Sequence, residues 1–152
     1  MPIRRMTETD LDAVERIAAE CSPYAAIWTR SQHLEMLERP DRYEAWVSDQ
    51  DGAVAGFLYF HATSGEAELD NLAVDPAWHR RGIGRGLIEL AWRQALERGV
   101  SAMFLEVRQA NTAAIRLYER CGFEKTGARR AYYSNPPEDA ICMVRRRLPS
   151  VT

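Results

Sequence analysis

The sequence predicts an α/β or α+β protein in which a mixed sheet carries helices on both faces. Three observations lead to this class. Segments with strand-like and helix-like periodicity alternate along the chain. The strand predicted at residues 54–61 has large apolar side chains on both parities, which is typical of a strand that is covered on both faces. A glycine-rich turn at residues 79–84 joins a further strand to a helix, as in folds that bind a ligand at such a turn.

Length and composition limit the classes to which the chain can belong. With 152 residues, 46% of them hydrophobic, we expect one domain, residues 1–152, whose core is large enough to fold without disulfides. No apolar stretch approaches the ~20 residues needed to cross a bilayer, and the N-terminus lacks the apolar region of a signal peptide. The expected compartment is therefore the cytoplasm.

Charge and cysteine content exclude further classes. The net charge of −2 argues against broad binding to nucleic acid or membranes, which needs a dominant basic surface. The arginine run at residues 145–147 alternates faces on a terminal strand, so we interpret it as a solvated edge. The cysteines are odd in number and far apart, and we expect buried thiols with no disulfide and no metal: Cys21, Cys121 and Cys142.

The N-terminal half is predicted to contain a short strand, two helices and a hairpin. Residues 3–6 are a strand candidate, and a helix with one apolar stripe follows as far as about Glu20. A second helix is predicted over residues 29–38, and strands over residues 43–48 and 54–61 form a hairpin. The bridge between the helices contains three large side chains that either close over an acceptor site as a lid or pin the helices to the sheet: Tyr24, Ile27 and Trp28.

The next predicted strand changes parity part-way along. Up to Leu69 the apolar residues occupy odd positions, whereas Leu72 and Val74 occupy even positions. Because a slip of one residue would turn one set of side chains to the wrong face, we expect a β-bulge near residues 70–71, which leaves some strand N–H groups unpaired. A strand buried on both faces around the small Ala73 explains the pattern equally well.

The turn that follows this strand has the composition of a phosphate site. Gly82 and Gly84 allow a tight turn into a helix, whose first N–H groups lack partners and attract an anion together with the helix dipole. The turn has neither the Gly-Lys-Ser/Thr ending of a Walker loop nor the G-x-G-x-x-G of a dinucleotide fold. An ordinary turn with solvated arginines is the alternative. The basic side chains available to a diphosphate are Arg80, Arg81 and Arg85.

One strand of the second half carries a candidate base. A helix is predicted over residues 84–98, followed by a strand over residues 101–107 in which Glu106 shares a face with Phe104. A carboxylate on such a half-buried face suits a general base. A strand end that meets Arg108 or water explains the same position without a catalytic role.

A turn, a helix and a hairpin are predicted to complete the chain. Asn111 is the expected cap of a helix over residues 113–120. Tyr118 lies on the inward face of this helix, where tyrosine is more often a core residue than an acid. Strands that reach about residue 133 and cover residues 140–147 form the final hairpin.

Two motifs give the chain a resemblance to the GNAT acetyltransferases. Residues 79–84, His-Arg-Arg-Gly-Ile-Gly, resemble the acetyl-coenzyme A signature Q/R-x-x-G-x-G/A, with His79 where Gln or Arg is usual. The Leu-Glu-Val-Arg of residues 105–108, followed by the Leu-Tyr-Glu of residues 117–119, is similar to the second motif. The resemblance covers about residues 66–143 and implies a mostly antiparallel sheet of six to seven strands with one splayed, bulged strand.

The resemblance also implies roles for single residues. The general base of the family falls on Glu106 and the general acid on Tyr118. Acetyl-coenzyme A is the implied co-substrate, with no metal. The splayed strand is implied to pair with the pantetheine arm and the glycine turn to hold the phosphates. The residues implied to bind the cofactor are Leu72, Ala73, Val74, Arg80, Arg81, Gly82, Ile83, Gly84, Arg85 and Asn111.

Later residues resemble the RimI-like branch, bacterial enzymes that acetylate the N-terminal alanine of a ribosomal protein. These are the paired arginines and tyrosines of residues 129–133 and the Glu-Asp-Ala of residues 138–140. The implied reaction transfers an acetyl group to the α-amino group of a protein N-terminus, and monomer or weak dimer is left open. Ser134 and Ile27 stand where this branch commonly has proline, next to the tyrosines and Trp28 respectively. Both departures leave the peptide specificity open.

Two other functions are compatible with the sequence. One is a GNAT enzyme that acetylates a small amine such as a polyamine or an aminoglycoside. The other is a non-catalytic acetyl-coenzyme A sensor, against which the presence of both Glu106 and Tyr118 argues, because a binding protein needs neither. The carboxylates available to a polycation are Glu66, Glu68, Asp70, Glu138 and Asp139.

Overall fold

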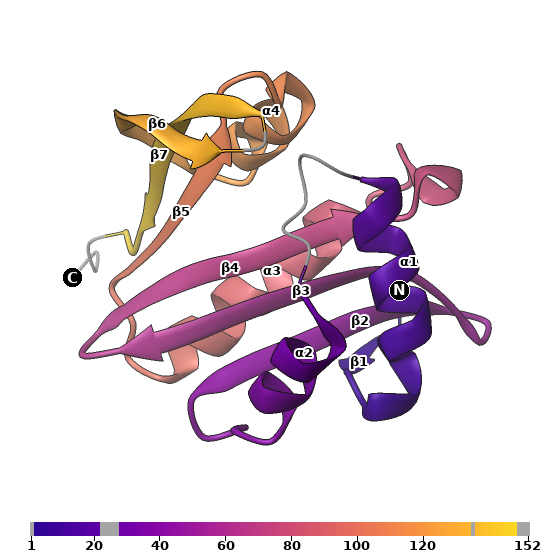
Figure 1. Ribbon diagram of the computed structural model, residues 1–152. Coiled ribbons are helices and arrows are strands. Elements are labelled where there is room, and N and C mark those ends of the chain that lie inside the picture. Colours follow the sequence, from indigo (N-terminus) through magenta and orange to yellow (C-terminus); the bar gives the residue numbers. More distant parts are fainter. Residues whose placement is uncertain (1, 22–27, 135, 149–152) are drawn as a thin grey trace.

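The computed structural model describes residues 2–21, 28–134 and 136–148. Within these ranges the centre of the fold is a seven-stranded sheet in the order β1-β2-β3-β4-β5-β7-β6 (Figure 1). Its strands are β1 (Ile3–Arg5), β2 (Tyr43–Gln50), β3 (Ala53–Thr63), β4 (Glu66–Val74), β5 (Ala102–Arg108), β6 (Glu124–Ser134) and β7 (Pro137–Arg146). The helices are α1 (Leu11–Glu20), α2 (Arg30–Leu37), α3 (Ile83–Glu97) and α4 (Thr112–Arg120), with short 3-10 turns at Glu8–Asp10 and Pro76–Trp78.

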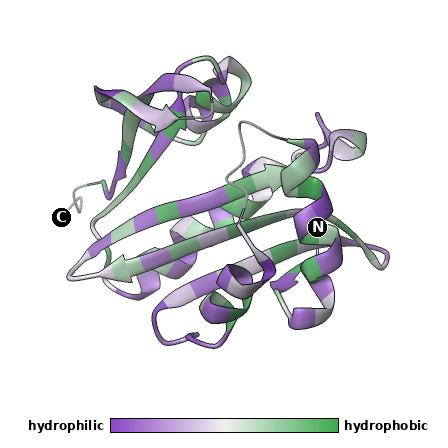
Figure 2. Ribbon diagram, viewed as in Figure 1, coloured by the Kyte–Doolittle hydropathy of each residue, from purple (hydrophilic) through white to green (hydrophobic). Residues whose placement is uncertain are grey.

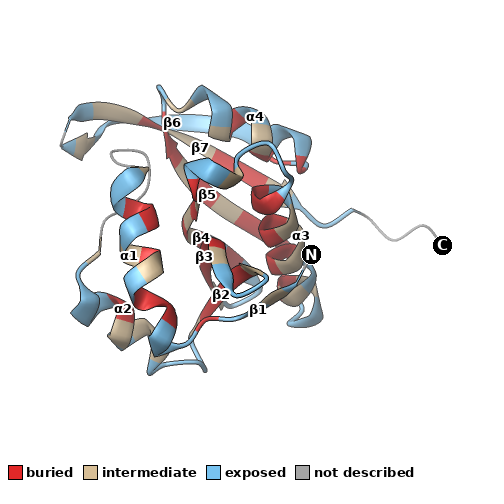
Figure 3. Ribbon diagram, turned by 90° about the vertical axis from the view of Figure 1, so that its right-hand side faces the viewer, coloured by how far each residue is buried: buried red, intermediate tan, exposed pale blue. Residues whose placement is uncertain are grey.

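Helices cover both faces of the sheet. Figure 3 shows α1 and α2 on one side of the strands and α3 on the other. The α3 side holds the larger buried apolar cluster, which includes Leu87 and Ile88 of that helix. The α1 side holds a second cluster, which includes Leu11 and Val14. The sheet is mixed, because β4 and β5 pair in parallel and the other neighbours antiparallel, so the predicted fold class is confirmed.

Local signals set the ends of the helices. Thr29 caps α2 by accepting a hydrogen bond from the backbone N–H of Gln32 at 3.1 Å. Asn111 caps α4 in the same way through the N–H of Ala114 at 3.2 Å, as predicted. Gly99, with a φ of 78°, follows the end of α3, where only glycine adopts the left-handed conformation without strain.

Both hairpins are tighter than the sequence predicts. β2 continues to Gln50 and β3 begins at Ala53, because Asp51 and Gly52 adopt φ values of 54° and 91° and close the turn with two residues. β7 begins at Pro137, three residues before the predicted start. The strands therefore extend into segments whose composition predicted loops.

The interpretation of residues 145–147 as a solvated edge is wrong for the strand and for its first arginine. β7 lies between β5 and β6 and is not at the edge of the sheet. The guanidinium of Arg145 donates to Glu89 at 2.9 Å and lies over the ring of Trp92 at 4.6 Å. The other two arginines of the run are exposed. The error arises because a terminal position in the sequence need not be a terminal position in the sheet.

The predicted bulge in β4 is present. Tyr59 pairs with Asn71 and Phe60 with Leu69, so Asp70 is the additional residue on β4. In consequence Ala67, Leu69, Leu72 and Val74 all pack on the cluster at the α3 side, although their parity changes. Ala73 packs on the opposite side, which means that the strand is also covered on both faces. Figure 2 shows the alternation of hydrophilic and hydrophobic residues along β4.

Two further expectations concern membranes and cysteines. In the described part of the chain, no helix is long and apolar enough to span a membrane. The three cysteines are free thiols, but only Cys121 is buried; Cys21 and Cys142 are half-buried, so the expectation of three buried thiols is wrong for two of them.

Candidate active site

β4 and β5 separate part-way along their length. Parallel pairing joins residues 66–68 of β4 to residues 102–104 of β5 and stops there. Beyond this point, in the part of the chain that the structure describes, β4 pairs with β3 and β5 pairs with β7. Figure 1 shows the two strands diverging, and we call the gap that they enclose the fork. The fork presents an edge of β4, residues 69–74, to which an extended ligand can add as a strand would.

A tight loop joins β4 to α3, and we call residues 79–84 the glycine loop. Gly82 has a φ of 76° and is the N-cap of α3; it has no side chain to cap the first turn, whose N–H groups therefore face the end of the helix. Gly84 allows close packing, since a Cβ at this position would lie 2.9 Å from Cδ2 of Leu117 in α4. The three arginines of this region are exposed: Arg80, Arg81 and Arg85.

Side chains anchor the glycine loop to the end of β4. His79, which departs from the family signature, donates from Nε2 to the carbonyl oxygen of Val74 at 3.0 Å. Cys21 donates from Sγ to the same oxygen at 3.3 Å. Arg81 lies over the ring of Trp78 at 4.9 Å. The departure at His79 thus has a structural consequence, because its side chain holds the loop against the strand.

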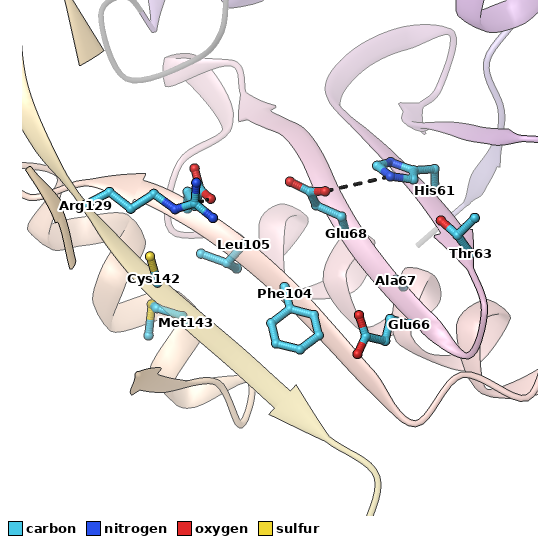
Figure 4. A pocket seen from close by; sticks show the side chains of 11 residues that line it. His61, Thr63, Glu66, Ala67, Glu68, Phe104, Leu105, Arg129, Cys142 and Met143 are labelled. Carbon is cyan, nitrogen blue, oxygen red and sulfur yellow. Dashed lines mark ion pairs between the residues drawn. The ribbon is translucent and has the colours of Figure 1, made fainter. Parts of the chain in front are cut away.

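A cavity of about 390 Å³ lies beside the fork, between β3, β4, β5, β6 and β7, and we call it the acceptor cavity. Figure 4 shows side chains of β3 and β4 on one side of this cavity and Arg129 reaching in from the other. The lining residues used below are His61, Glu66, Glu68, Phe104, Glu106 and Arg129. The sequence-predicted base therefore lies in a cavity that side chains from five strands enclose.

Glu106 is held by two neighbours on β6. Its side chain is 18% exposed, and Oε1 lies 3.1 Å from Nε of Arg129. The hydroxyl of Tyr132 also forms a hydrogen bond with the Glu106 carboxylate, which together with burial raises the pKa of Tyr132. Phe104, the neighbour on the same face of β5, is half-buried as well. Glu106 therefore lines the cavity and pairs with Arg129, whereas Arg108, the alternative partner predicted from the sequence, donates to the carbonyl oxygen of Pro136 and to Glu138.

Tyr118 is placed differently from Glu106. It is 7% exposed, belongs to the core cluster on the α3 side, and packs edge-on against Phe123 at 5.7 Å between ring centroids. Burial raises its pKa well above the ordinary value, so its hydroxyl keeps its proton at any physiological pH. Burial and the charge of Glu106 raise the pKa of Tyr133 to about 12, so this hydroxyl also keeps its proton at physiological pH.

The structure does not bring all of the candidate carboxylates together. Glu66 and Glu68 line the acceptor cavity. Glu138 instead accepts a hydrogen bond from the backbone N–H of Ala110 at 2.5 Å. Asp139 accepts a hydrogen bond from the N–H of Ala131 at 2.8 Å. Glu138 therefore ties the β6–β7 hairpin to the segment that follows β5, whereas Asp139 joins β7 to β6 within the hairpin. Neither carboxylate lines the acceptor cavity.

The bridge between α1 and α2 is described only at its last residue. Tyr24 and Ile27 lie outside the described residues. Trp28 packs edge-on against Tyr59 at 4.8 Å and tilts against His33 at 5.5 Å. Of the two interpretations of the bridge, the contacts of Trp28 fit the one in which aromatic side chains pack the helices against the sheet.

Sequence reasoning missed a third group beside the acceptor cavity. His61 of β3 pairs with Glu68 of β4 in the sheet register, and the bulge places Asp70 next to the same imidazole. Nδ1 of His61 lies 2.8 Å from Oδ2 of Asp70, and Nε2 lies 3.7 Å from Oε2 of Glu68. Burial raises the pKa of Asp70 to about 6, against the opposing effect of its hydrogen bond with His61. Spacing along β3 does not reveal this contact, because only the pairing register of β3 with β4 brings His61 to Asp70.

Comparison with known proteins identifies the family. Residues 11–123 match the model of the Acetyltransferase (GNAT) family. The ribosomal protein bS18-alanine N-acetyltransferase of Escherichia coli K12 is 38% identical over 143 residues, which cover 93% of this chain and 94% of that protein. The crystal structure of the ribosomal-protein-S18-alanine N-acetyltransferase from Escherichia coli has a TM-score of 0.85 at 34% identity, with 99% of this chain and 96% of that chain covered.

A further solved structure agrees with these two. Ard1 from Thermoplasma volcanium has a TM-score of 0.87 at 30% identity, with 97% of this chain and 98% of that chain covered. The resemblance to the RimI-like branch is confirmed by the relatives from Escherichia coli. The chain belongs to the acetyltransferase (GNAT) family.

Proposed function

We propose that the chain, as one acetyltransferase domain over residues 1–152, transfers the acetyl group of acetyl-coenzyme A to the N-terminal α-amino group of a protein. The observation that carries this proposal is the position of Glu106, whose carboxylate lines the acceptor cavity beside the open edge of β4. The relatives named for the N-terminal alanine of a ribosomal protein support the same acceptor. A ribosomal acceptor places the reaction in the cytoplasm.

The glycine loop and the fork suit acetyl-coenzyme A. A diphosphate fits the N-terminus of α3, where Gly82 leaves the first N–H groups without a side-chain cap and Arg80, Arg81 and Arg85 are exposed nearby. The amide-bearing pantetheine arm fits the edge of β4 at Leu72, Ala73 and Val74, as an added strand. Ile83, Gly84 and Asn111 complete the proposed cofactor site.

The acceptor amine must lose its charge before it can react. An α-amino group has a pKa of about 7.7–8.0, whereas lysine has about 10.4, so an N-terminus needs less help at neutral pH. Bound acetyl-coenzyme A supplies an activated acetyl thioester. Glu106 accepts a proton from the amine, and backbone N–H groups near Leu72 stabilise negative charge on the acetyl oxygen. Tyr118 gives its proton to the leaving sulfur, and its hydroxyl carries this proton at neutral pH.

A small polyamine is the second candidate acceptor. Glu66 and Glu68 line the acceptor cavity, and within the described residues neither forms an ion pair with an arginine or lysine. Neighbouring carboxylates of this kind attract polycations. Glu138 and Asp139 bind backbone N–H groups instead, which makes this cluster smaller than the sequence suggests. The smaller cluster is why we place the peptide acceptor first.

The experiment that tests this proposal measures thiol release from acetyl-coenzyme A with several acceptors. Short peptides that begin with Ala, Ser or Met are compared with a peptide that begins with acetyl-blocked Ala and with spermidine. Turnover of the free α-amines that blocking abolishes supports the proposal. Turnover of spermidine with none of any peptide overturns it in favour of a small-amine enzyme, and thermal stabilisation by acetyl-coenzyme A without any thiol release favours a sensor.

A further inference from the structure

Acetylation of a charged amine removes two protons from the nitrogen. An ammonium acceptor loses one proton to become a nucleophile and a second after the C–N bond forms, while the C–S bond breaks and one proton ends on the thiolate sulfur. The net reaction thus releases one proton to solvent. Glu106 can take one of the two, but its Oε1 is also engaged by Arg129 at 3.1 Å. The chemistry therefore has room for a second proton acceptor in the cavity.

The carboxylates of the cavity make a second proton acceptor more necessary. Negative charges within a few ångströms stabilise an ammonium ion and hold its proton more firmly. Glu66, Glu68 and Glu106 all line the cavity, so an acceptor amine that enters it is favoured in the charged, unreactive form. A neutral base close to these carboxylates would offset this effect.

His61 has the surroundings of such a base. Its imidazole lines the acceptor cavity and is 22% exposed, while Asp70, which is 16% exposed, lies behind it. Asp70 is ionised above about pH 6, so the 2.8 Å contact is a hydrogen bond that the Nδ1–H of His61 donates to Oδ2. This tautomer leaves the lone pair on Nε2. A carboxylate that orients an imidazole in this way is a recurring arrangement in enzymes that use histidine as a base.

Resting on the proposed function, we propose that His61 is a second catalytic base that accepts the first proton from the acceptor ammonium at Nε2, and that Asp70 is the positioning residue that fixes its tautomer. The neutral amine then attacks the acetyl carbonyl, and Glu106 takes the second proton. The imidazolium is flanked by the Asp70 and Glu68 carboxylates, and Figure 4 shows the contact between His61 and Glu68. Glu68 is 53% exposed, so the proton can pass to solvent on that side.

Several other charged or titratable groups lie near this pair. On β2, the ring of Tyr43 packs edge-on against His61 at 5.8 Å, and the neighbouring Arg42 acts on the charge of Asp70. Across the cavity, Glu106 of β5 and Arg129 of β6 form their own ion pair. In the contacts of the described residues, none of these groups donates to Nε2 of His61, whose neighbour is Oε2 of Glu68 at 3.7 Å; the lone pair on Nε2 therefore has no donor to engage it.

The test compares the pH dependence of kcat/KM for wild type, His61→Gln and Asp70→Asn, with a peptide that begins with free Ala. At pH 6.5 the amine is mostly charged, and we expect a roughly tenfold loss for His61→Gln; at pH 9 the amine is neutral, and the loss shrinks to about twofold or less. Asp70→Asn should show a smaller loss with the same pH trend. If kcat/KM of either variant falls by the same factor at both pH values, the residue has a structural role and the proposal is overturned. An unchanged kcat/KM in either variant also overturns it.

Controls separate this proposal from the proposed function and from metal binding. Asp51→Asn makes the same chemical change as Asp70→Asn in the β2–β3 turn and should leave the pH profile unchanged. The atoms of His61, Glu68 and Asp70 lie close enough to hold a cation, so all assays contain a chelator; activity that requires added Zn²⁺ overturns the role as a base. If the wild type acetylates no α-amine, the proposed function fails. Nitrogen NMR then determines which ring nitrogen of neutral His61 carries the proton. A proton on Nε2 overturns the proposal, whereas a proton on Nδ1 that moves in Asp70→Asn supports it.

Discussion

The cofactor side and the acceptor side of the fork are built in different ways. The glycine loop and the N-terminus of α3 form a continuous stretch of chain, in which backbone N–H groups and glycine conformations provide the surface at which we propose that the cofactor binds. The acceptor cavity is lined instead by side chains from β3, β4, β5, β6 and β7, which meet only because of the register of the sheet. The cofactor side therefore depends on the conformation and close packing of the backbone, and the acceptor side depends on the chemistry of individual side chains.

The largest effect that this comparison predicts is on the acceptor side. Glu106→Gln should lower kcat by at least about a hundredfold, because it removes the proposed general base, while the affinity for acetyl-coenzyme A changes little. Steady-state kinetics and acetyl-coenzyme A titration measure the two quantities. Arg129→Gln is the matched control, because it breaks the same ion pair and keeps the carboxylate. An equal loss in this control would assign the effect to the ion pair.

Tyr118→Phe should reduce turnover by roughly tenfold to a hundredfold, since it removes only the proton that the sulfur receives. The ring keeps its edge-on contact with Phe123, so the fold and the affinity for acetyl-coenzyme A should be nearly unchanged. Kinetics and isothermal titration check both parts. A large loss of affinity with unchanged turnover of bound substrate would assign Tyr118 to cofactor binding or packing and would remove it from the acceptor chemistry.

The same difference explains how far the sequence could predict the site. The glycine loop, the bulge at Asp70 and the cap at Asn111 are local patterns, and each is found where the sequence predicts it. The sequence did not predict the contacts of His61 and Arg129. His61 meets Asp70 through the β3–β4 register, and Arg129 meets Glu106 across the β5–β7–β6 pairing. Side chains that converge from separate strands cannot be found from spacing along the chain.

On the cofactor side, a single methyl group should matter. Gly84→Ala places a Cβ 2.9 Å from Cδ2 of Leu117, so the end of this side chain must shift. The overpacking should offset the ~1 kcal/mol that alanine gains in a helix and leave a net loss of up to about 2 kcal/mol. Thermal unfolding and acetyl-coenzyme A titration measure the loss. Gly86→Ala is the matched control, because its nearest neighbour is Cδ1 of Ile3 at an ordinary 3.6 Å, and it should be neutral or stabilising. Equal effects of both substitutions would contradict the packing argument.

The smallest predicted effect concerns pH and the helix that covers the α1–α2 face. His33 of α2 is fully buried, its Nδ1 lies 2.6 Å from the hydroxyl of Tyr59, and in the described residues its Nε2 has no hydrogen-bond partner. Burial lowers the pKa of His33, so the unfolded chain binds this proton more readily than the folded one. Neutral His33 therefore makes its full contribution to the free energy of unfolding above its unfolded-state pKa of about 6.5. This contribution is lost as the pH falls toward its folded-state pKa.

His33→Gln tests this dependence, because glutamine can keep a hydrogen bond to Tyr59 and does not titrate. Between pH 7.5 and pH 5 the melting temperature of wild type should fall more steeply than that of the variant, whatever their difference at pH 7.5. Parallel slopes would show that His33 is accommodated in its charged form. A steeper wild-type slope would show that the folded chain accommodates His33 only in its neutral form, so that one buried imidazole makes the stability of the fold depend on pH.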